Sequence, residues 1–509
     1  MTISQISMLV VMTVYLFGMI GVGIKLSDET ETVNDFYLGG RKLGPFVTAM
    51  SAEASDMSSW LLMGLPGVAY LSGIADAGWT AVGLAFGTYL NWLIVAKRLR
   101  MYTAASKSFT VPVFFSHRYG DKKNILTLIS AVWIIVFFVP YTASGFAACG
   151  KLFNALFGVD YHAAMVVSAI IIMFYTTMGG FLAASMTDFI QSIVMTIALA
   201  VILIFGIVTA GGLDAVFANA ASLPGYLSIT SSYDPQTGKS VSYTVLTIAS
   251  NAAWGLGYFG MPHILLRFMA IEDENKIKLS RRVASVWVVI SMAVAVLIGI
   301  VGLGMTRVGA VEELSGSNSE TIIVKCAHLL STHGIIPAAV AGIVLSGILA
   351  STMSTSDSQL LAASSSVSND ILVNVFKVKF SEKLILTISR ISLMVIAFIG
   401  VVIAWDPNSS VFSIVSFAWA GFGAAFGPVV LLALFWRRSN KYGAITGMIV
   451  GGVMVFVWKY LVSPMGGILG IYELLPSFLI ALLVNVLVSL ITAAPEKEVV
   501  EMFDQVSHR

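Results

Sequence analysis

Long apolar segments recur through the chain, and each has the length that a helix needs to cross a bilayer. Because about 20 apolar residues span the hydrocarbon core, we predict about thirteen transmembrane helices, near residues 5–25, 45–72, 79–98, 125–153, 162–183, 187–211, 244–270, 284–306, 336–366, 385–405, 411–436, 443–461 and 473–493. Only 11% of the residues are charged, against about 25% in soluble domains. We therefore expect an all-α polytopic membrane protein with a lipid bilayer around it.

The distribution of Lys and Arg predicts the orientation, because cytoplasmic loops are enriched in basic residues. With the amino terminus outside, only five of the 29 basic residues lie on the outer side, namely Lys151, Lys239, Arg307, Lys325 and Lys459. The remaining ones, among them Arg41 and Arg267, are assigned to the inner loops and tail. An odd number of spans then places the carboxyl terminus in the cytoplasm. We expect a multi-pass protein of the cell membrane.

Polar residues interrupt the span near 45–72 at Ser55, Asp56 and Ser58. A carboxylate near the middle of a membrane costs about 2.5–3.5 kcal/mol on insertion scales, so Asp56 needs a cation, a polar partner or water. Helical backbone breaks at that depth only where the freed N–H and C=O groups line a cavity or meet a ligand. The stretch therefore predicts a discontinuous helix of the kind that forms ion and substrate sites in secondary transporters.

A second interruption lies at 254–262, where three glycines and a proline weaken the helix. It stands five spans after the first, which is the spacing that an inverted five-plus-five repeat gives. Trp254, Tyr258 and Phe259 could wall a small apolar ligand at such a break. An ordinary kink with close helix packing, and aromatic residues in the core, is the alternative interpretation.

A third group consists of hydroxyl residues at Ser351, Ser354, Thr355 and Ser358. Their spacing places all four on one helical face. Small hard cations prefer oxygen ligands, so this face suits sodium; alternatively, the hydroxyls hold neighbouring helices together. Asp188 stands near the inner end of its span, where a solvated or capping role is the simpler interpretation.

Longer strings in a fixed order carry a more specific likeness; they are Leu38–Phe46, Ala54–Gly67, Thr177–Ala183, Trp254–Gly260, Met353–Thr355 and Trp419–Pro428. Together they resemble the sodium/proline symporters of the sodium:solute symporter family, from about residue 5 to 493. The resemblance implies a LeuT-type inverted repeat, sodium-coupled uptake and an outside amino terminus. The expected units are 1–44 (first flanking helix and inner loop), 45–211 (first five-helix repeat), 212–243 (outer loop), 244–436 (second repeat) and 437–509 (two final helices and tail).

The resemblance also assigns residues to sites. A sodium site would use backbone carbonyls of Ala54, Met57 and Ser351 with the hydroxyls of Ser354 and Thr355. A proline pocket would involve Trp60, Tyr141, Trp254, Tyr258 and Pro262. Asp56 would serve sodium coupling, and Arg41 would influence coupling from the inner side. Some family members carry a second sodium site at positions that match Asp188, Asp357 and Ser358, so two sodium ions per cycle is a further hypothesis.

The chain departs from the family pattern at three positions. Glu53 stands where a small residue is expected, Ser59 replaces a common glycine, and Met261 occupies a position that is often polar. Glu53 either adds a charge beside the ion path or is paired elsewhere, and we favour pairing elsewhere.

We predict a secondary transporter that imports L-proline with Na⁺ by alternating access, functions as a monomer and is not an enzyme. No organic cofactor and no nucleic acid partner are expected. A phosphate loop (GxxxxGK[ST]) and a zinc-binding HExxH string are both missing from the sequence, which argues against an ATP-driven pump and a zinc hydrolase. A passive channel is a weaker alternative. The serious rival is a sodium symporter for another solute, such as a different amino acid, pantothenate or a sugar.

Overall fold

A computed structural model describes residues 2–27 and 33–507 of the chain. The first half consists of α1 (Ile3–Ser27), α2 (Val33–Leu38), η1 (Gly39–Arg41), α3 (Pro45–Ser59), η2 (Trp60–Gly64), α4 (Leu65–Ser72), α5 (Ile74–Leu90), η3 (Asn91–Val95), α6 (Ala96–Ala105), α7 (Val111–Arg118), α8 (Ile125–Phe157), α9 (Tyr161–Thr209), α10 (Leu213–Ala221), β1 (Ser231–Asp234) and β2 (Lys239–Ser242). The sequence predicts which side of the membrane each terminus occupies, but the terminal residues 1, 508 and 509 lie outside the described residues.

The second half consists of α11 (Val245–Ala252), η4 (Ala253–Gly260), α12 (Pro262–Ala270), η5 (Glu274–Lys276), α13 (Ile277–Arg307), η6 (Gly316–Thr321), α14 (Ile322–Ser331), α15 (Ile335–Ser365), η7 (Ser366–Val375), α16 (Glu382–Ile403), α17 (Val411–Phe435), α18 (Lys441–Val457), η8 (Trp458–Val462), η9 (Ser463–Met465), η10 (Gly467–Leu469), α19 (Leu474–Ile491) and α20 (Lys497–Ser507). The predicted helical class is confirmed. The outer segment 212–243 adds one short antiparallel hairpin, in which Ser231 pairs with Ser242.

Within the described ranges, 10 helices are long and apolar enough to cross a membrane. They coincide with ten of the predicted spans. The other three predicted spans, near 45–72, 162–183 and 244–270, are those in which the structure has short or broken helices. The boundary expected between 183 and 187 lies at Gly180, whose non-helical φ of 62° and ψ of −172° divide α9 into two helices; glycine tolerates this conformation. The multi-pass architecture is confirmed, and the count of thirteen stays a prediction.

The first predicted break lies at Ser58, whose φ of 48° and ψ of −171° interrupt α3. Backbone in this region is nearly restricted to glycine, and holding another residue there costs about 1–3 kcal/mol. The Trp60 amide donates to Ser58 Oγ at 3.1 Å, so the serine side chain satisfies one group that the break frees. The polar interruption in the sequence therefore marks an actual break of the helix.

The second predicted break is at Met261, which is extended (φ −76°, ψ 108°) between η4 and α12. The segment before it is wound as a 3-10 helix rather than an α-helix. Pro262 then starts α12, where its missing N–H is not needed. Both interruptions read from the sequence are thus confirmed as broken helices.

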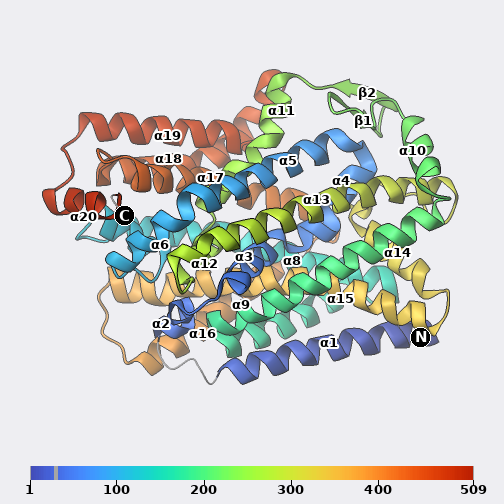
Figure 1. The fold of residues 1–509 in the computed structure, drawn as a ribbon, viewed down its shortest axis with the longest axis horizontal. Coiled ribbons are helices and arrows are strands. Elements are labelled where there is room, and N and C mark those ends of the chain that lie inside the picture. The colour runs from blue at the N-terminus through green and yellow to red at the C-terminus, as the bar shows by residue number, and fades with distance from the viewer. Residues whose placement is uncertain (1, 28–32, 508–509) are drawn as a thin grey trace.

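Figure 1 shows how the helices are arranged around these breaks. Helix α1 runs along one long edge of the molecule, α18 and α19 lie at the opposite edge, and the broken helices α3 and α12 lie between them. Helix α1 begins at one end of the long axis, and α20 lies at the other. The discontinuous segments are therefore enclosed by continuous helices, which shield their free backbone groups from lipid.

Glycines bring α5 and the second broken helix into backbone contact. A Cβ added at Gly83 would lie 2.2 Å from the Ala252 carbonyl oxygen, and one at Gly87 would lie 2.3 Å from the Gly255 carbonyl oxygen. Small residues one turn apart allow such close approach between membrane helices. This contact fixes the position of η4 relative to the rest of the core.

Gly87→Ala is therefore expected to lower the melting temperature of the detergent-solubilised protein. Overpacking of this kind costs about 1–3 kcal/mol. The matched control is Gly18→Ala in α1, where an added Cβ meets nothing within 4 Å. Equal melting temperatures for the two variants in a thermal unfolding assay would contradict this packing argument.

Candidate functional site

Helix α15 places its hydroxyl residues against the broken helix α3. Ser354 Oγ donates hydrogen bonds to the carbonyl oxygens of Ala54 and Ser351, at 2.9 and 3.2 Å. Thr355 Oγ1 donates to the same Ser351 oxygen at 3.1 Å. Met57, one turn after Ala54 in α3, is buried as well. The hydroxyl and carbonyl oxygens that gather here are the ligand type of a hard monovalent cation.

A small cavity of about 10 Å³ adjoins this oxygen cluster. Trp60, Tyr141 and Trp254, which were predicted to bind substrate, line it together with Asp56 and Met57. The ring centroids of Trp60 and Trp254 are 5.4 Å apart. Mostly apolar walls with a few polar groups suit a small ligand of mixed character.

Asp56 connects the two broken helices. The Tyr258 hydroxyl in η4 donates a hydrogen bond to Asp56 Oδ2 at 2.5 Å. The Tyr141 hydroxyl in α8 donates a hydrogen bond to the Asp56 carbonyl oxygen at 3.2 Å. Asp56 is 6% exposed, and its Oδ1 atom has no hydrogen-bond partner among the described residues. This carboxylate therefore lies beside both the oxygen cluster and the cavity, with one oxygen available.

An aromatic cluster covers one side of the cavity. The Phe412 ring, in the first turn of α17, lies 6.0 Å from the Trp60 ring and 5.4 Å from the Trp254 ring. The Phe412 amide donates to Glu320 Oε1 at 3.0 Å, and Glu320 forms a buried ion pair with Lys151 at 2.9 Å. Lys151, expected at the outer surface, thus has a buried partner that anchors the start of α17.

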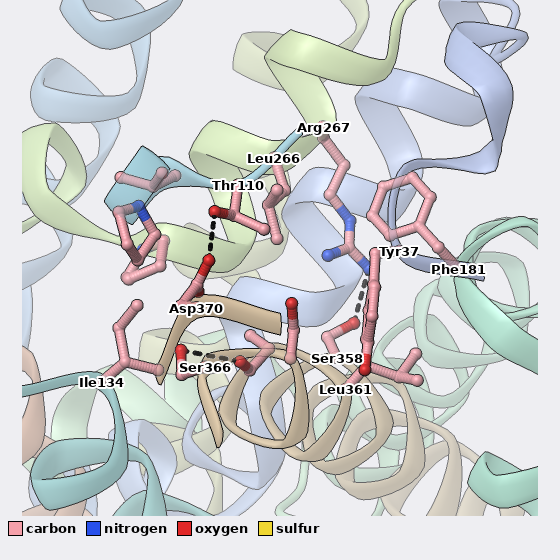
Figure 2. Close-up of a pocket in the computed structure, with 15 residues that line it drawn as sticks. Tyr37, Thr110, Ile134, Phe181, Leu266, Arg267, Ser358, Leu361, Ser366 and Asp370 are labelled. Carbon is pink, nitrogen blue, oxygen red and sulfur yellow. Dashed lines mark hydrogen bonds between the residues drawn. The ribbon is translucent and has the colours of Figure 1, made fainter. Parts of the chain in front are cut away.

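The residues of the hypothetical second sodium site surround a buried guanidinium. Arg267 lies 3.0 Å from Asp188 Oδ2 and donates to Ser358 Oγ at 2.5 Å. Ser51 Oγ donates to the same Asp188 oxygen at 2.7 Å, and Asp357 Oδ1 accepts from Ser358 at 3.3 Å. Figure 2 shows Arg267 pointing at Ser358.

Two sequence interpretations are therefore wrong. Arg267, assigned to an inner loop, is 1% exposed, and Asp188, expected to be solvated or capping, is fully buried. The Arg267 and Asp188 charges compensate each other, because a buried charge is tolerated only when it is paired. The Oδ1 atom of Asp188 and the Oδ2 atom of Asp357 have no partner among the described residues. A second sodium site here stays a prediction.

A separate cavity of about 20 Å³ extends from Arg267 and Ser358 toward Asp370. Thr110 Oγ1 donates to Asp370 Oδ1 at 2.8 Å on its far side (Figure 2). Pro262 lines this cavity and is not among the residues that line the aromatic one. Pro262 thus lines a different cavity from Trp60, Tyr141 and Trp254, with which the sequence resemblance grouped it, and its place in a proline pocket stays a prediction.

Arg41 lies away from both cavities. Its guanidinium donates to the carbonyl oxygens of Met269 (2.6 Å), Ser108 (2.8 Å) and Thr103 (3.1 Å). Burial and the nearby Arg100 lower the pKa of Arg41 to about 10, so it stays charged at neutral pH. It ties the segment before α3 to α6 and α12, which is a position from which it could influence the broken helices.

Several residues of the site were not singled out from the sequence. Phe412 and Trp419 face the aromatic residues, and Trp419 Nε1 donates to the Trp254 carbonyl at 2.7 Å. Leu84, Met292 and Val415 complete the cavity lining. Gly423, shortly after Trp419, was the available signal, because it lets α17 approach η4: a Cβ added at Gly423 would lie 2.8 Å from Gly257 Cα.

Membrane-crossing helices that enclose two broken helices, with an oxygen cluster and a small buried cavity between them, define a secondary transporter. The chain belongs to the sodium:solute symporter family, whose model matches residues 36–451.

Two named relatives match over nearly the whole length. The chain is 42% identical over 501 residues to the sodium/proline symporter of Haemophilus influenzae, which covers 98% of this chain and 97% of that one. It is 39% identical over 500 residues to the osmoregulated proline transporter OpuE of Bacillus subtilis, with 98% of each chain covered. Both relatives are transporters by name.

The fold also has a solved counterpart. A Na⁺-coupled sialic acid symporter, in a substrate-bound outward-open state, superposes with a TM-score of 0.78 at 19% identity and covers 96% of this chain and 99% of that one. This likeness supports the transporter fold, whereas the exact inverted repeat stays a prediction.

Arg267→Gln is expected to lower the free energy of unfolding by about 3–5 kcal/mol, because it leaves Asp188 and Asp357 without their buried cation. The double variant Arg267→Gln/Asp188→Asn should regain part of that loss, since one uncompensated carboxylate is removed. Arg267→Lys keeps the charge and serves as the control. Thermal unfolding in detergent at low sodium ranks the stabilities of the variants. A double variant less stable than Arg267→Gln would contradict the argument.

Proposed function

We propose that the protein imports L-proline together with Na⁺ across the cell membrane by alternating access. The observation that carries this proposal is the adjacency of the α3–α15 oxygen cluster to a small aromatic cavity that includes Asp56. Family membership supports sodium coupling, and two full-length relatives named as proline transporters support the substrate. The pyrrolidine ring would pack on the aromatic residues, while the carboxylate would meet free N–H groups at the break in α3.

In this proposal the oxygens of Ala54, Met57, Ser351, Ser354 and Thr355 bind sodium, and Asp56 stabilises the occupied site. Trp60, Tyr141, Trp254 and Tyr258 surround the substrate, as the sequence resemblance implies. Pro262, which the resemblance also assigns to the proline pocket, lines the second cavity. Arg41 acts on coupling through its contacts with α6 and α12.

Sodium binding would stabilise the outward-open state and order the proline pocket, and both ligands would leave inward. Each ligand then raises the affinity of the other by the same factor. One inward charge gains about 2.3 kcal/mol per 100 mV, and a tenfold sodium gradient adds about 1.4 kcal/mol. One sodium ion could thus support an accumulation of roughly five-hundredfold.

The proposal includes an outside amino terminus, a cytoplasmic carboxyl terminus, a monomeric transporter and no enzymatic activity. The charge distribution supports the orientation. In Figure 1, α1 begins at one end of the long axis and α20 lies at the other, which is the arrangement that an odd number of crossings gives. A sodium symporter for another small solute is the second candidate. The structural relative supports this second candidate, because a protein with the same fold is a symporter for sialic acid, which is a sugar acid.

Uptake of labelled L-proline into proteoliposomes, with and without an inward sodium gradient, tests the proposal. Sodium-driven accumulation above equilibrium, competed by unlabelled proline and by no other amino acid, is the expected result. If sodium drives no proline uptake, the substrate assignment is wrong, and a screen for solutes that bind in the presence of sodium takes its place.

Ser354→Ala should raise the sodium concentration for half-maximal uptake by about tenfold, because loss of one cation ligand of about 1.4 kcal/mol has that effect. Ser346→Ala is the matched control in α15, since the Ser346 hydroxyl donates only to Gly342 of its own helix, at 2.8 Å. Its sodium dependence should equal that of the wild type. Indistinguishable sodium curves for the two variants would contradict the placement of the site.

Asp56→Asn removes the charge but keeps an oxygen that can accept from Tyr258. We expect a rise in the sodium requirement larger than that of Ser354→Ala, because the charge acts on the ion in a low-dielectric interior. Membrane insertion should be unaffected, as checked by the amount of protein in purified membranes. Unchanged sodium dependence of uptake would exclude a coupling role for Asp56.

A further inference from the structure

A groove lies between α9 and α13, and among the described residues it shares no lining residue with the two cavities above. Its volume is about 520 Å³, and ligand sites usually measure about 300–1,000 Å³. Thr196, Leu199 and Ala200 form its wall on α9. The wall on α13 runs from Arg282 to Val294. Both helices are long and apolar enough to cross a membrane, so the surroundings of this α9–α13 groove are lipid.

The walls of the α9–α13 groove are mostly apolar and open outward. Ile290 on α13 is 56% exposed. The polar groups of the walls have partners within the chain. Trp287 Nε1 donates a hydrogen bond to Thr196 Oγ1 at 2.9 Å, and Ser291 Oγ donates to the Val288 carbonyl oxygen at 3.2 Å. Such a surface binds a hydrocarbon chain through van der Waals contacts, whereas a polar solute would find few partners on it.

Positive charge stands at one end of the groove. Among the described residues that line it, Arg282 alone is charged, and it lies near the start of α13. Lys278 is one turn earlier on the same helix face. Both side chains are exposed, and no ion pair within residues 2–27 and 33–507 includes either of them. Basic residues in such positions bind anionic lipid headgroups.

The length of the groove matches one leaflet of a bilayer. Its wall on α13 extends about 18 Å from Arg282 to Val294, because an α-helix rises about 1.5 Å per residue. Half of the hydrocarbon core of a bilayer is about 15 Å thick. An acyl chain whose headgroup lies at Arg282 would therefore follow the groove to the middle of the membrane.

The groove also reaches the first broken helix. Met50 of α3 is part of its lining, and α13 packs against both α3 and α9. Met50 lies one turn before Ala54, whose carbonyl oxygen accepts the hydrogen bond from Ser354. A chain in the groove would thus contact the helix that carries part of the proposed sodium site.

We propose that the α9–α13 groove binds an anionic phospholipid, with its phosphate at Arg282 and Lys278 and one acyl chain along Trp287. The phosphate accepts charge-assisted hydrogen bonds from the guanidinium and ammonium groups. In the proposed orientation this is a lipid of the cytoplasmic leaflet. The inference does not depend on which solute is transported, because the groove is separate from the aromatic cavity.

Trp287 reports occupancy of the groove, because a brominated acyl chain quenches the fluorescence of a tryptophan that it touches. The full-length protein is reconstituted in phosphatidylcholine vesicles in which one lipid in twenty is brominated phosphatidylglycerol or, in parallel, brominated phosphatidylcholine. The Trp287 signal is the difference between the wild type and Trp287→Phe. We expect the anionic probe to quench this signal at least about fivefold more than the zwitterionic probe, since each basic residue near the surface attracts an anionic lipid by about that factor.

Arg282→Gln removes a proposed phosphate contact and should lower quenching by the anionic probe about fivefold. Arg282→Lys keeps the charge and should retain most of the quenching. The matched control is Arg390→Gln, because Arg390 is an exposed arginine of α16 that does not line the groove. Its quenching should equal that of the wild type. Each variant is measured against its own Trp287→Phe counterpart.

Ala200→Phe tests the place of the acyl chain independently, and it keeps the proposal testable if Arg282→Gln does not fold. The added ring would fill the groove from α9, so quenching by the anionic probe should fall. Unchanged quenching in Ala200→Phe would overturn the place of the chain, and unchanged quenching in Arg282→Gln would overturn the place of the phosphate.

Two results with the wild type would overturn the whole proposal. Equal quenching by the two probes would mean that only exchangeable annular lipid touches Trp287. Absence of quenching by both probes would mean that another occupant, such as a second copy of this chain, covers the groove. Neither result bears on proline uptake, so failure of this inference is distinct from failure of the proposed function.

Discussion

Charge inside the membrane is the constraint on which the rest of the structure depends. Each buried acidic group needs compensation, and the molecule supplies it in two ways. Asp188 and Glu320 have fixed partners in Arg267 and Lys151, so their contacts hold helices together. Asp56 has only a neutral donor. An acidic residue inside a membrane without a fixed cation is a functional-site candidate, so this difference is consistent with the proposed role of Asp56 in sodium coupling.

The break in α3 follows from the same constraint. Ser58 holds a conformation that costs about 1–3 kcal/mol in a non-glycine residue, and such strain persists only where the surroundings maintain it. Helix α15 bonds to the Ala54 carbonyl before the break, and Tyr141 bonds to the Asp56 carbonyl. The carbonyls near the break thus face polar partners, so the local strain produces the oxygen-rich surface that an ion requires.

The sequence predicts those features that act locally. Ser58 and Met261 lie in the two interruptions because polar residues, glycine and proline weaken a helix wherever they stand, and Ser354 lies on the face that its spacing predicts. Arg267 was misplaced because charge counting treats a basic residue near a helix end as solvated, although its partner is distant in the sequence. Phe412 could not be found, since its role depends on how α17 packs against two broken helices.

The proposed coupling between ion and substrate has a covalent basis, because α3 continues directly into η2. Ala54 contributes to the oxygen cluster, Asp56 follows it in α3, and Trp60, which begins η2 two residues after the break at Ser58, lines the cavity. If sodium and substrate bind as proposed, a change at the break near Ser58 would act on both the oxygen cluster and the Trp60 side of the cavity. Binding of one ligand would then change the affinity for the other, and linkage requires that effect to be reciprocal.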